Sequence, residues 1–362
     1  MSIANLAPSS ESEIAELVTS ETERIHIAGG QSRLLATEKK IISTSALNGI
    51  VEYEPGALTM VAKAGTPLSI IKETLQKENQ QLAFEPPEFK HILMLQGNST
   101  IGGVFATNAS GSRRIQVGAA RDHLLGVRFV DGLGRIIKNG GRVMKNVTGY
   151  DLVKLLAGSW GTLGLITEVS FKVLPIAETQ LTLKLNLCDA RILTTAINTP
   201  YDISGTFYDV GLRSAYIRVE GFDESVKYRV QQLLAEFSDF EIDILNMEQS
   251  KKFWKNVNNL DFLKNITGDL WRISVKPTDG IKIIEILDPK VGFLDWCGGL
   301  VWIRIDEGCD VRGKIQKLAG HAMCLLGDFD QFHPSSVIEK KLSGSIRNKF
   351  DPQMLFNQEI LN

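Results

Sequence analysis

Short apolar runs separated by turn residues fill the first half of the chain and predict a mixed order of strands and helices. The spacing of apolar residues predicts a helix over 11–20 and a second helix that begins at Pro67, with Thr66 as its N-cap. A third helix is predicted over 151–157, whereas residues 82–99 show no periodicity and are expected to form a loop. Alternation of apolar and polar residues predicts strands over 24–28, 41–43, 50–54, 58–64, 125–131, 134–138 and 164–174.

The pattern changes after Pro175. Residues 181–187 alternate strictly between apolar and polar, which predicts a half-buried antiparallel strand. Further strands of the same sheet are predicted over 216–220, 271–275 and 300–305, and helices over 223–237, 248–256 and 279–287. This order favours an α+β fold over a doubly wound parallel sheet, and no repeat period stands out.

Composition narrows the class of protein. A length of 362 residues suggests two domains at about 150 residues each, or one domain with an insertion, and a net charge of −2 argues against a nucleic-acid binder. The four cysteines form no C-x-x-C pair and the five histidines show no zinc spacing, so we expect free thiols and no metal site. No apolar run reaches the roughly 18 residues of a membrane span, and residues 1–10 do not resemble a signal peptide. We therefore expect a cytoplasmic protein.

Glycine is unevenly distributed. Fourteen of the 32 glycines lie between Gly97 and Gly164, where they alternate with apolar residues that a disordered linker would not carry. Three glycine-rich segments allow two interpretations each. Residues 28–32 form either a phosphate-binding concavity or a plain strand turn. Residues 100–111 either face a flat ligand or pack closely in a core. Residues 158–168 place their backbone either against a ligand or at a tight crossing of two segments. Neither a dinucleotide G-x-G-x-x-G fingerprint nor a nucleophile elbow is present.

Taken in order, these segments resemble the FAD-binding (PCMH-type) domain of the vanillyl-alcohol oxidase and p-cresol methylhydroxylase superfamily. The matching motifs are residues 28–32, 100–111, Gly149-Tyr150-Asp151-Leu152 and 158–168, with a C-terminal match at Phe356-Asn357. Within the superfamily the chain is most similar to the flavin-binding E subunits of bacterial glycolate oxidase. The residues that indicate this are Glu85-Pro86-Pro87, Ser112-Arg113-Arg114, Trp160, His321-Ala322 and the run 141–151.

The resemblance implies a fold and a cofactor. The expected organisation is a two-subdomain FAD-binding domain over 1–175, a smaller antiparallel α+β cap domain over 176–325, and a C-terminal segment, 326–362, that returns to the FAD domain. FAD is expected to be bound non-covalently, because His26 precedes the glycines of the phosphate loop rather than lying within it. The residues that match cofactor-binding positions of the family are Gly29, Gly30, Gln31, Ser32, Thr100, Gly102, Gly103, Ala106, Asn108, Gly111, Gly158, Gly161, Thr162, Gly164, Ile166 and Asn357.

The resemblance also implies an activity. It indicates a complex that oxidises glycolate to glyoxylate, with a second flavoprotein subunit and an iron–sulfur subunit as partners of this chain. Any attachment of this chain to a membrane is expected to be through those partner subunits. A catalytically silent FAD-carrying relay or scaffold subunit, and a stand-alone flavin-dependent D-2-hydroxy-acid dehydrogenase, remain as alternatives. His321 is the candidate base, with a structural histidine as the other interpretation, and Lys145 and Tyr150 flank the Gly149 turn. An arginine is expected to bind the substrate carboxylate, and the candidates are Arg113, Arg114, Arg142 and Arg304. Of these, Arg114 is a candidate catalytic residue together with His321, Lys145 and Tyr150.

Overall fold

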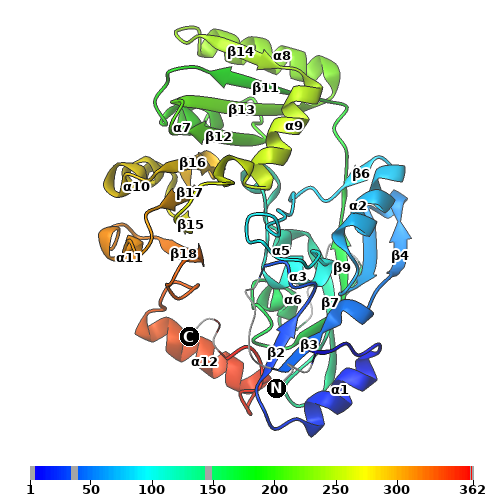
Figure 1. Ribbon diagram of the computed structural model, residues 1–362. Helices are drawn as coiled ribbons and strands as arrows, with labels where there is room; N and C mark the ends of the chain where they lie inside the picture. Colours follow the sequence, from blue (N-terminus) through cyan, green and yellow to red (C-terminus); the bar gives the residue numbers. More distant parts are fainter. Residues whose placement is uncertain (1–4, 34–39, 143–148, 359, 361–362) are drawn as a thin grey trace. The chain divides into compact units, whose positions relative to one another are not determined.

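The chain divides into two compact units, shown as a computed structural model that describes residues 5–33, 40–142, 149–358 and 360 (Figure 1). Unit 1 comprises Met1–Ser110, Gly118–Ile176 and Pro334–Asn362, and unit 2 comprises Gly111–Val117 and Ala177–His333. Both units combine helices with mainly antiparallel sheets, which confirms the predicted α+β class. No helix in the described ranges is long and apolar enough to cross a membrane.

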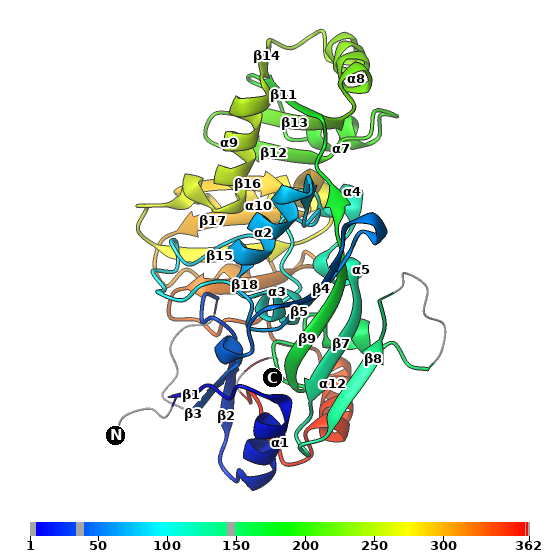
Figure 2. The same ribbon diagram turned by 90° about the vertical axis from the view of Figure 1, so that its right-hand side faces the viewer.

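Unit 1 contains two main sheets. Its strands are β1 (Asn5–Leu6), β2 (Ile25–Ala28), β3 (Lys40–Ser43), β4 (Ile50–Glu54), β5 (Thr59–Lys63), β6 (Gln80–Gln81), β7 (Leu124–Val130), β8 (Ile136–Gly140), β9 (Leu165–Lys172) and β10 (Leu174–Pro175). Its helices are α1 (Glu11–Ser20), α2 (Leu68–Lys77), α3 (Ile101–Ala106), α5 (Ala120–His123), α6 (Leu152–Leu156) and α12 (Val337–Phe350). Strands β4-β5-β9-β7-β8 form an antiparallel sheet, whose strands lie side by side in Figure 2. Strands β1-β3-β2 form a small parallel sheet.

The predicted helices and strands of unit 1 are confirmed to within a few residues, and local chemistry explains their ends. Helix α1 begins after Ser10, whose hydroxyl accepts a hydrogen bond from the Glu13 amide, and it buries Ile14 and Val18. Helix α3 begins at Thr100, whose hydroxyl accepts from the Gly103 amide. The C-terminal segment adds to β2, because the Ile25 amide donates to the Leu355 carbonyl.

The prediction that Thr66 caps α2 is wrong. Pro67 occupies the N-cap position, and Thr66 is fully buried just after β5. Its hydroxyl donates to the Lys63 carbonyl at 2.7 Å and accepts from the Gly49 amide at 3.0 Å. A buried hydroxyl has to be satisfied by whichever partners lie nearest, and here these are the last residue of β5 and the residue before β4 rather than the helix.

Unit 2 is built on one antiparallel sheet. Its strands are β11 (Thr179–Leu185), β12 (Gly205–Asp209), β13 (Ser214–Gly221), β14 (Ile242–Leu245), β15 (Asp269–Ser274), β16 (Val291–Asp295), β17 (Leu300–Ile305) and β18 (His321–Leu326). Its helices are α4 (Arg114–Val117), α7 (Ile192–Ile197), α8 (Asp223–Glu236), α9 (Met247–Asn258), α10 (Gly280–Leu287) and α11 (Val311–Lys314). The strand order is β14-β11-β13-β12-β16-β17-β15-β18, so the three strands predicted after 181–187 do join the same sheet.

A repeat that the sequence did not reveal organises this sheet. The elements β11-α7-β12-β13-α8-β14 and β15-α10-β16-β17-α11-β18 follow the same order, a split βαβ arrangement, and β12 pairs with β16 where the two halves meet. Because each half is specified by its own apolar pattern, the topology repeats without a sequence period. The sequence therefore has no repeat period, but the order of its strands and helices does repeat.

The two faces of the unit 2 sheet differ in chemistry. Helices α7, α8, α10 and α11 cover one face and bury its aliphatic side chains, including Ile217 and Ile303, in a single core. Helix α9 lies on the other face, where Phe253 stacks on Tyr216 with ring centroids 4.2 Å apart; α8 and α9 are on opposite sides of these strands in Figure 2. The same face also carries polar and aromatic side chains, among them Arg218, Arg272 and Trp302.

Candidate functional site

Unit 1 contains a recess with about 1100 Å³ of empty space, counting the part open to solvent. The end of β2, the loop that follows it, residues 95–97, α3 and residues 160–166 form its walls. Of the predicted cofactor-binding residues, those that line the recess are Gly29, Gly30, Gln31, Ser32, Thr100, Gly102, Gly103, Ala106, Gly161, Gly164 and Ile166.

Two glycines in the wall are required because two loops cross in contact. A Cβ atom on Gly30 would lie 1.7 Å from the carbonyl oxygen of Asn98, and one on Gly97 would lie 1.7 Å from the carbonyl oxygen of Gly30. Real Cβ atoms do not approach backbone oxygens so closely, so neither position accepts a side chain without separating the loops. The crossing joins residues 67 positions apart in sequence and shapes the recess.

The loop after β2 presents backbone donors. The amides of Gly30, Gln31 and Ser32 donate no hydrogen bond to any residue that the structure describes, and Gln31 has a left-handed φ of 51°. Successive free amides in such a turn suit a phosphate. Arg33, which the sequence analysis missed although it directly follows this loop, also lines the recess. Burial lowers the pKa of Arg33 to about 10, against the opposing effect of Glu88, so the guanidinium stays charged at neutral pH.

These residues fit FAD. The amides of 30–32 and Arg33 would hold the anionic diphosphate. The apolar part of the recess, which includes Ile27, Leu95 and Trp160, offers surfaces for flat rings. Gly97 and Trp160 were not predicted to touch the cofactor. Gly97 could have been inferred from the start of the glycine cluster, whereas Trp160 lay inside a recognised motif as an unassigned position.

Five predicted cofactor-binding residues do not line the recess: Asn108, Gly111, Gly158, Thr162 and Asn357. Gly111 belongs to unit 2, where its carbonyl accepts from the indole of Trp296. Three others act within the scaffold of unit 1. The Asn108 carboxamide accepts from the Arg121 amide, the Gly158 amide donates to Phe105, and the Thr162 hydroxyl donates to Ser159.

The side chain of Asn357 forms hydrogen bonds to two segments that line the recess. Its Oδ1 accepts from the Ile27 amide at 2.7 Å, and its Nδ2 donates to the Trp160 carbonyl at 2.6 Å. The side chain is 1% exposed. Because Ile27 and Trp160 both line the recess, Asn357 positions them relative to each other.

We expect Asn357→Ala to weaken FAD binding about tenfold, since leaving buried donors and acceptors unpaired costs about 1–3 kcal/mol. Asn357→Asp should be worse than the alanine variant, because it places a carboxylate oxygen against the Trp160 carbonyl. Flavin titration of the apoprotein, followed by fluorescence, measures the affinities. Equal affinity of the aspartate variant and the unaltered chain would contradict this role.

The candidate catalytic residues are divided between the two units. Tyr150 is in unit 1 with 89% of its surface exposed, and Lys145 lies outside the described residues. His321 and Arg114 both belong to unit 2. His321 begins β18, and its ring centroid lies 5.3 Å from that of His333. Partial burial, then the charges of His333, Arg272 and Arg312, lower the pKa of His321, which keeps the imidazole neutral and able to accept a proton.

Three of the four arginines proposed for a substrate carboxylate are committed to protein partners. Arg113 forms an ion pair with Glu220 at 3.1 Å, and Arg142 forms one with Glu52. The guanidinium of Arg304 donates to the carbonyls of Leu263 and Gly268. Arg114 also contacts the protein, since it lies over the ring of Trp296, with its Cζ 4.5 Å from the centroid.

Comparisons with known proteins agree with this site. Residues 4–140 match the family model "FAD binding domain". The chain is 33% identical over 317 residues to "Glycolate oxidase subunit GlcE" of Escherichia coli, covering 85% of this chain and 83% of that protein. It is 36% identical to "Glycolate oxidase subunit GlcD" of Bacillus subtilis, over only 38% of this chain and 28% of that one.

A solved structure described as alkyldihydroxyacetonephosphate synthase superposes with a TM-score of 0.71 at 17% identity, covering 97% of this chain and 75% of that chain, which shows a shared fold. The GlcE similarity extends over most of both sequences, and the recess fits the cofactor that the family model describes. FAD is therefore the cofactor, and the chain belongs to the glycolate oxidase subunit GlcE family of flavin oxidoreductases.

Proposed function

We propose that the chain is the FAD-binding subunit of a glycolate oxidase complex and takes part in oxidising glycolate, or a closely related 2-hydroxy acid, to the 2-oxo acid. The observation that carries this proposal is the similarity to a glycolate oxidase subunit over 317 residues, a length greater than the whole of unit 1. The similarity therefore includes unit 2, whose polar sheet face carries His321 and several arginines.

The residues of the chain suit the individual roles. FAD, when bound, supplies the acceptor for the hydride that leaves the α-carbon. The recess in unit 1 would hold that cofactor through the amides of 30–32 and Arg33, which line it. The neutral imidazole of His321 takes the proton of the substrate hydroxyl. The two electrons then have to leave the chain, and we assign that step to a second flavoprotein subunit and an iron–sulfur subunit of the same complex.

A second candidate is a subunit that carries FAD without oxidising the substrate itself. The limited similarity to GlcD favours it, because the match to that protein spans only 38% of this chain and 28% of GlcD. In this case the chain relays electrons or acts as a scaffold.

Spectroscopy on the purified chain distinguishes the two. Without visible flavin absorption after gentle purification and FAD addition, both candidates fail. If anaerobic glycolate bleaches the flavin of the chain alone, the chain oxidises substrate; if bleaching requires the partner subunits, the relay role is supported. Bleaching by D-lactate but not by glycolate would instead favour a stand-alone D-2-hydroxy-acid dehydrogenase.

We expect His321→Gln to slow substrate-dependent flavin reduction at least tenfold while leaving the bound FAD in place, since a positioned base contributes about 10²–10⁴ to the rate. Because the pKa of His321 is lowered from 6.5, reduction by the unaltered chain should decline only when the pH falls below that value. Stopped-flow rates from pH 5 upwards test this. A purely structural histidine would leave both the rate and its pH dependence unchanged.

A further inference from the structure

Arg272 lies on the polar face of the unit 2 sheet. In β15 it pairs directly with Trp302 of β17 and with Met323 of β18, and the next pair on the same face joins Ser274 to His321. Directly paired residues project from the same face, and alternate residues along a strand do so as well. The side chains of Arg272, Trp302 and His321 therefore share this face, away from the four helices that cover the core.

Aromatic rings, not acceptors, surround the guanidinium of Arg272. Its Cζ lies 5.1 Å from the ring centroid of Trp296 and 5.8 Å from that of Trp302. Within the described ranges, no residue accepts a hydrogen bond from this guanidinium or forms an ion pair with it. Five N–H donors of this half-buried side chain thus lack a protein acceptor within the described ranges and are available to a ligand.

A second cation lies against the same indole. The guanidinium of Arg114 lies over the ring of Trp296, so Trp296 contacts both arginines. Burial, then the like charge of Arg114, lowers the pKa of Arg272 to about 10, and Asp295 opposes them only in part. The carboxylate of Asp295 is already engaged, because it accepts from the Ser112 hydroxyl at 2.8 Å and from the Trp296 amide at 2.7 Å. The like charge of Arg114 beside Arg272 favours a bound anion at Arg272.

We propose that Arg272 binds the carboxylate of a small organic acid, with Arg114 as the second cation and Trp296 and Trp302 as the aromatic walls that orient the guanidinium. A planar guanidinium with unused donors matches a carboxylate by two parallel hydrogen bonds. The assignment of this acid as the 2-hydroxy acid substrate rests on the proposed function, and it places the carboxylate on the strand next to His321.

Oxalate is the appropriate probe, because it is a two-carbon carboxylate that cannot be oxidised at an α-carbon. Isothermal titration of the full chain should show saturable oxalate binding that Arg272→Gln weakens at least tenfold. Arg272→Lys should bind with intermediate affinity, since it keeps the charge and loses the bidentate geometry. The matched control is Arg191→Gln, which removes an exposed arginine of the same unit and should bind oxalate like the unaltered chain.

The outcomes are separable. Equal oxalate affinity in the unaltered chain and in a folded Arg272→Gln variant overturns the inference, as does displacement of oxalate by sulfate at equal concentration. Flavin reduction by glycolate with an unchanged half-saturating concentration in Arg272→Lys overturns it while the proposed function stands. Arg272-dependent oxalate binding without any flavin reduction, even with partner subunits present, rejects the proposed function and leaves the anion site in place.

Discussion

Replacing Gly30 by alanine is expected to yield a chain that no longer retains FAD, whereas replacing Gly56 by alanine should leave FAD binding unchanged. The added Cβ at Gly30 would lie 1.7 Å from a backbone carbonyl oxygen, while at Gly56 it meets no heavy atom within 4 Å. Overpacking typically costs about 1–3 kcal/mol where side chains can adjust, but a backbone oxygen can move away only if the two loops separate. We therefore expect FAD affinity to fall about a hundredfold or more.

The measurement is the ratio of flavin absorbance to protein after gel filtration, followed by FAD titration of each variant. Four of the five tryptophans, Trp254, Trp271, Trp296 and Trp302, lie in unit 2, so their emission reports whether unit 2 stays folded. Full retention of FAD by Gly30→Ala would show that the loops can separate without loss of the cofactor site.

The phosphate-loop glycines could be predicted from sequence, but the physical reason for them could not. The Gly29-Gly30 turn after a strand indicates a concavity, and the loop does line the recess. The need for glycine at position 30 comes from Asn98, which the sequence placed in a featureless loop. Contacts between segments this far apart leave no local periodicity, so only the folded chain reveals them.

The environments of the arginines could not be predicted from local sequence either. Sequence context selected Arg113, Arg114 and Arg142 inside recognised motifs and Arg304 in a predicted strand. Arg113, Arg142 and Arg304 have partners from distant segments. Arg272 stands in an ordinary apolar strand pattern with no motif around it. Its environment comes from strand pairing with Trp302 and from Trp296 in the turn after β16, both non-local.

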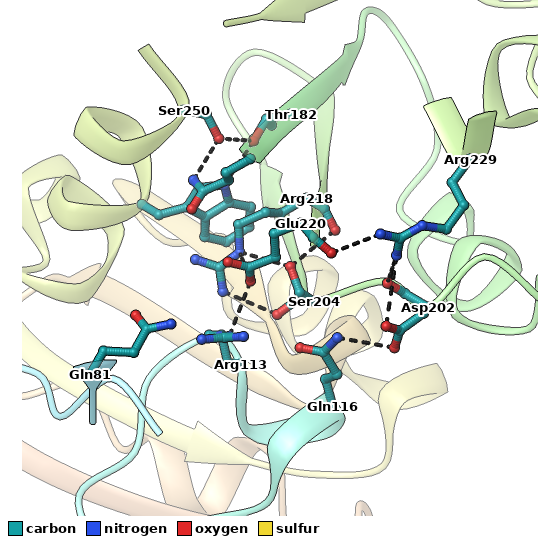
Figure 3. A network of polar contacts seen from close by, with 12 residues as sticks. Gln81, Arg113, Gln116, Thr182, Asp202, Ser204, Arg218, Glu220, Arg229 and Ser250 are labelled. Carbon is teal, nitrogen blue, oxygen red and sulfur yellow. Dashed lines mark hydrogen bonds and ion pairs between the residues drawn. The ribbon is translucent and has the colours of Figure 1, made fainter. Parts of the chain in front are cut away.

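A buried ion network holds the segment Gly111–Val117 within unit 2 (Figure 3). Glu220 on β13 lies between Arg113 and Arg218, with its Oε1 3.1 Å and 3.4 Å from their Nε atoms, and its side chain is 6% exposed. Arg218 also donates to the Ser204 carbonyl. Gln116 of the same segment donates to Asp202, which adds a contact at the surface. Glu220 is thus the shared anion of two buried guanidiniums.

We expect Glu220→Gln to destabilise unit 2 by about 3–5 kcal/mol, because removing one partner of a buried ion pair leaves uncompensated charge. Glu224→Gln is the matched control: Glu224 is 91% exposed and contacts Lys227 only at the surface, so its loss should change stability by less than about 0.5 kcal/mol. Urea unfolding followed by tryptophan emission measures both. Equal midpoints for the two variants would mean that the network contributes little.

The difference in stability between the unaltered chain and Glu220→Gln should change with pH in one direction. Burial by itself would raise the pKa of Glu220, but the charges of Arg218 and Arg113, the Ser204 hydroxyl and Arg229 outweigh it and hold the pKa below 4.5. A carboxyl whose pKa is depressed by folding contributes stability above its unfolded pKa and loses that contribution as the pH falls through the folded value. The gap between the unaltered chain and Glu220→Gln should therefore be constant from neutral pH down to about 5 and narrow below 4.5. A gap that widened on acidification would mean that Glu220 is protonated in the folded chain at neutral pH, and the ion network would then have to be reassigned as a set of neutral hydrogen bonds.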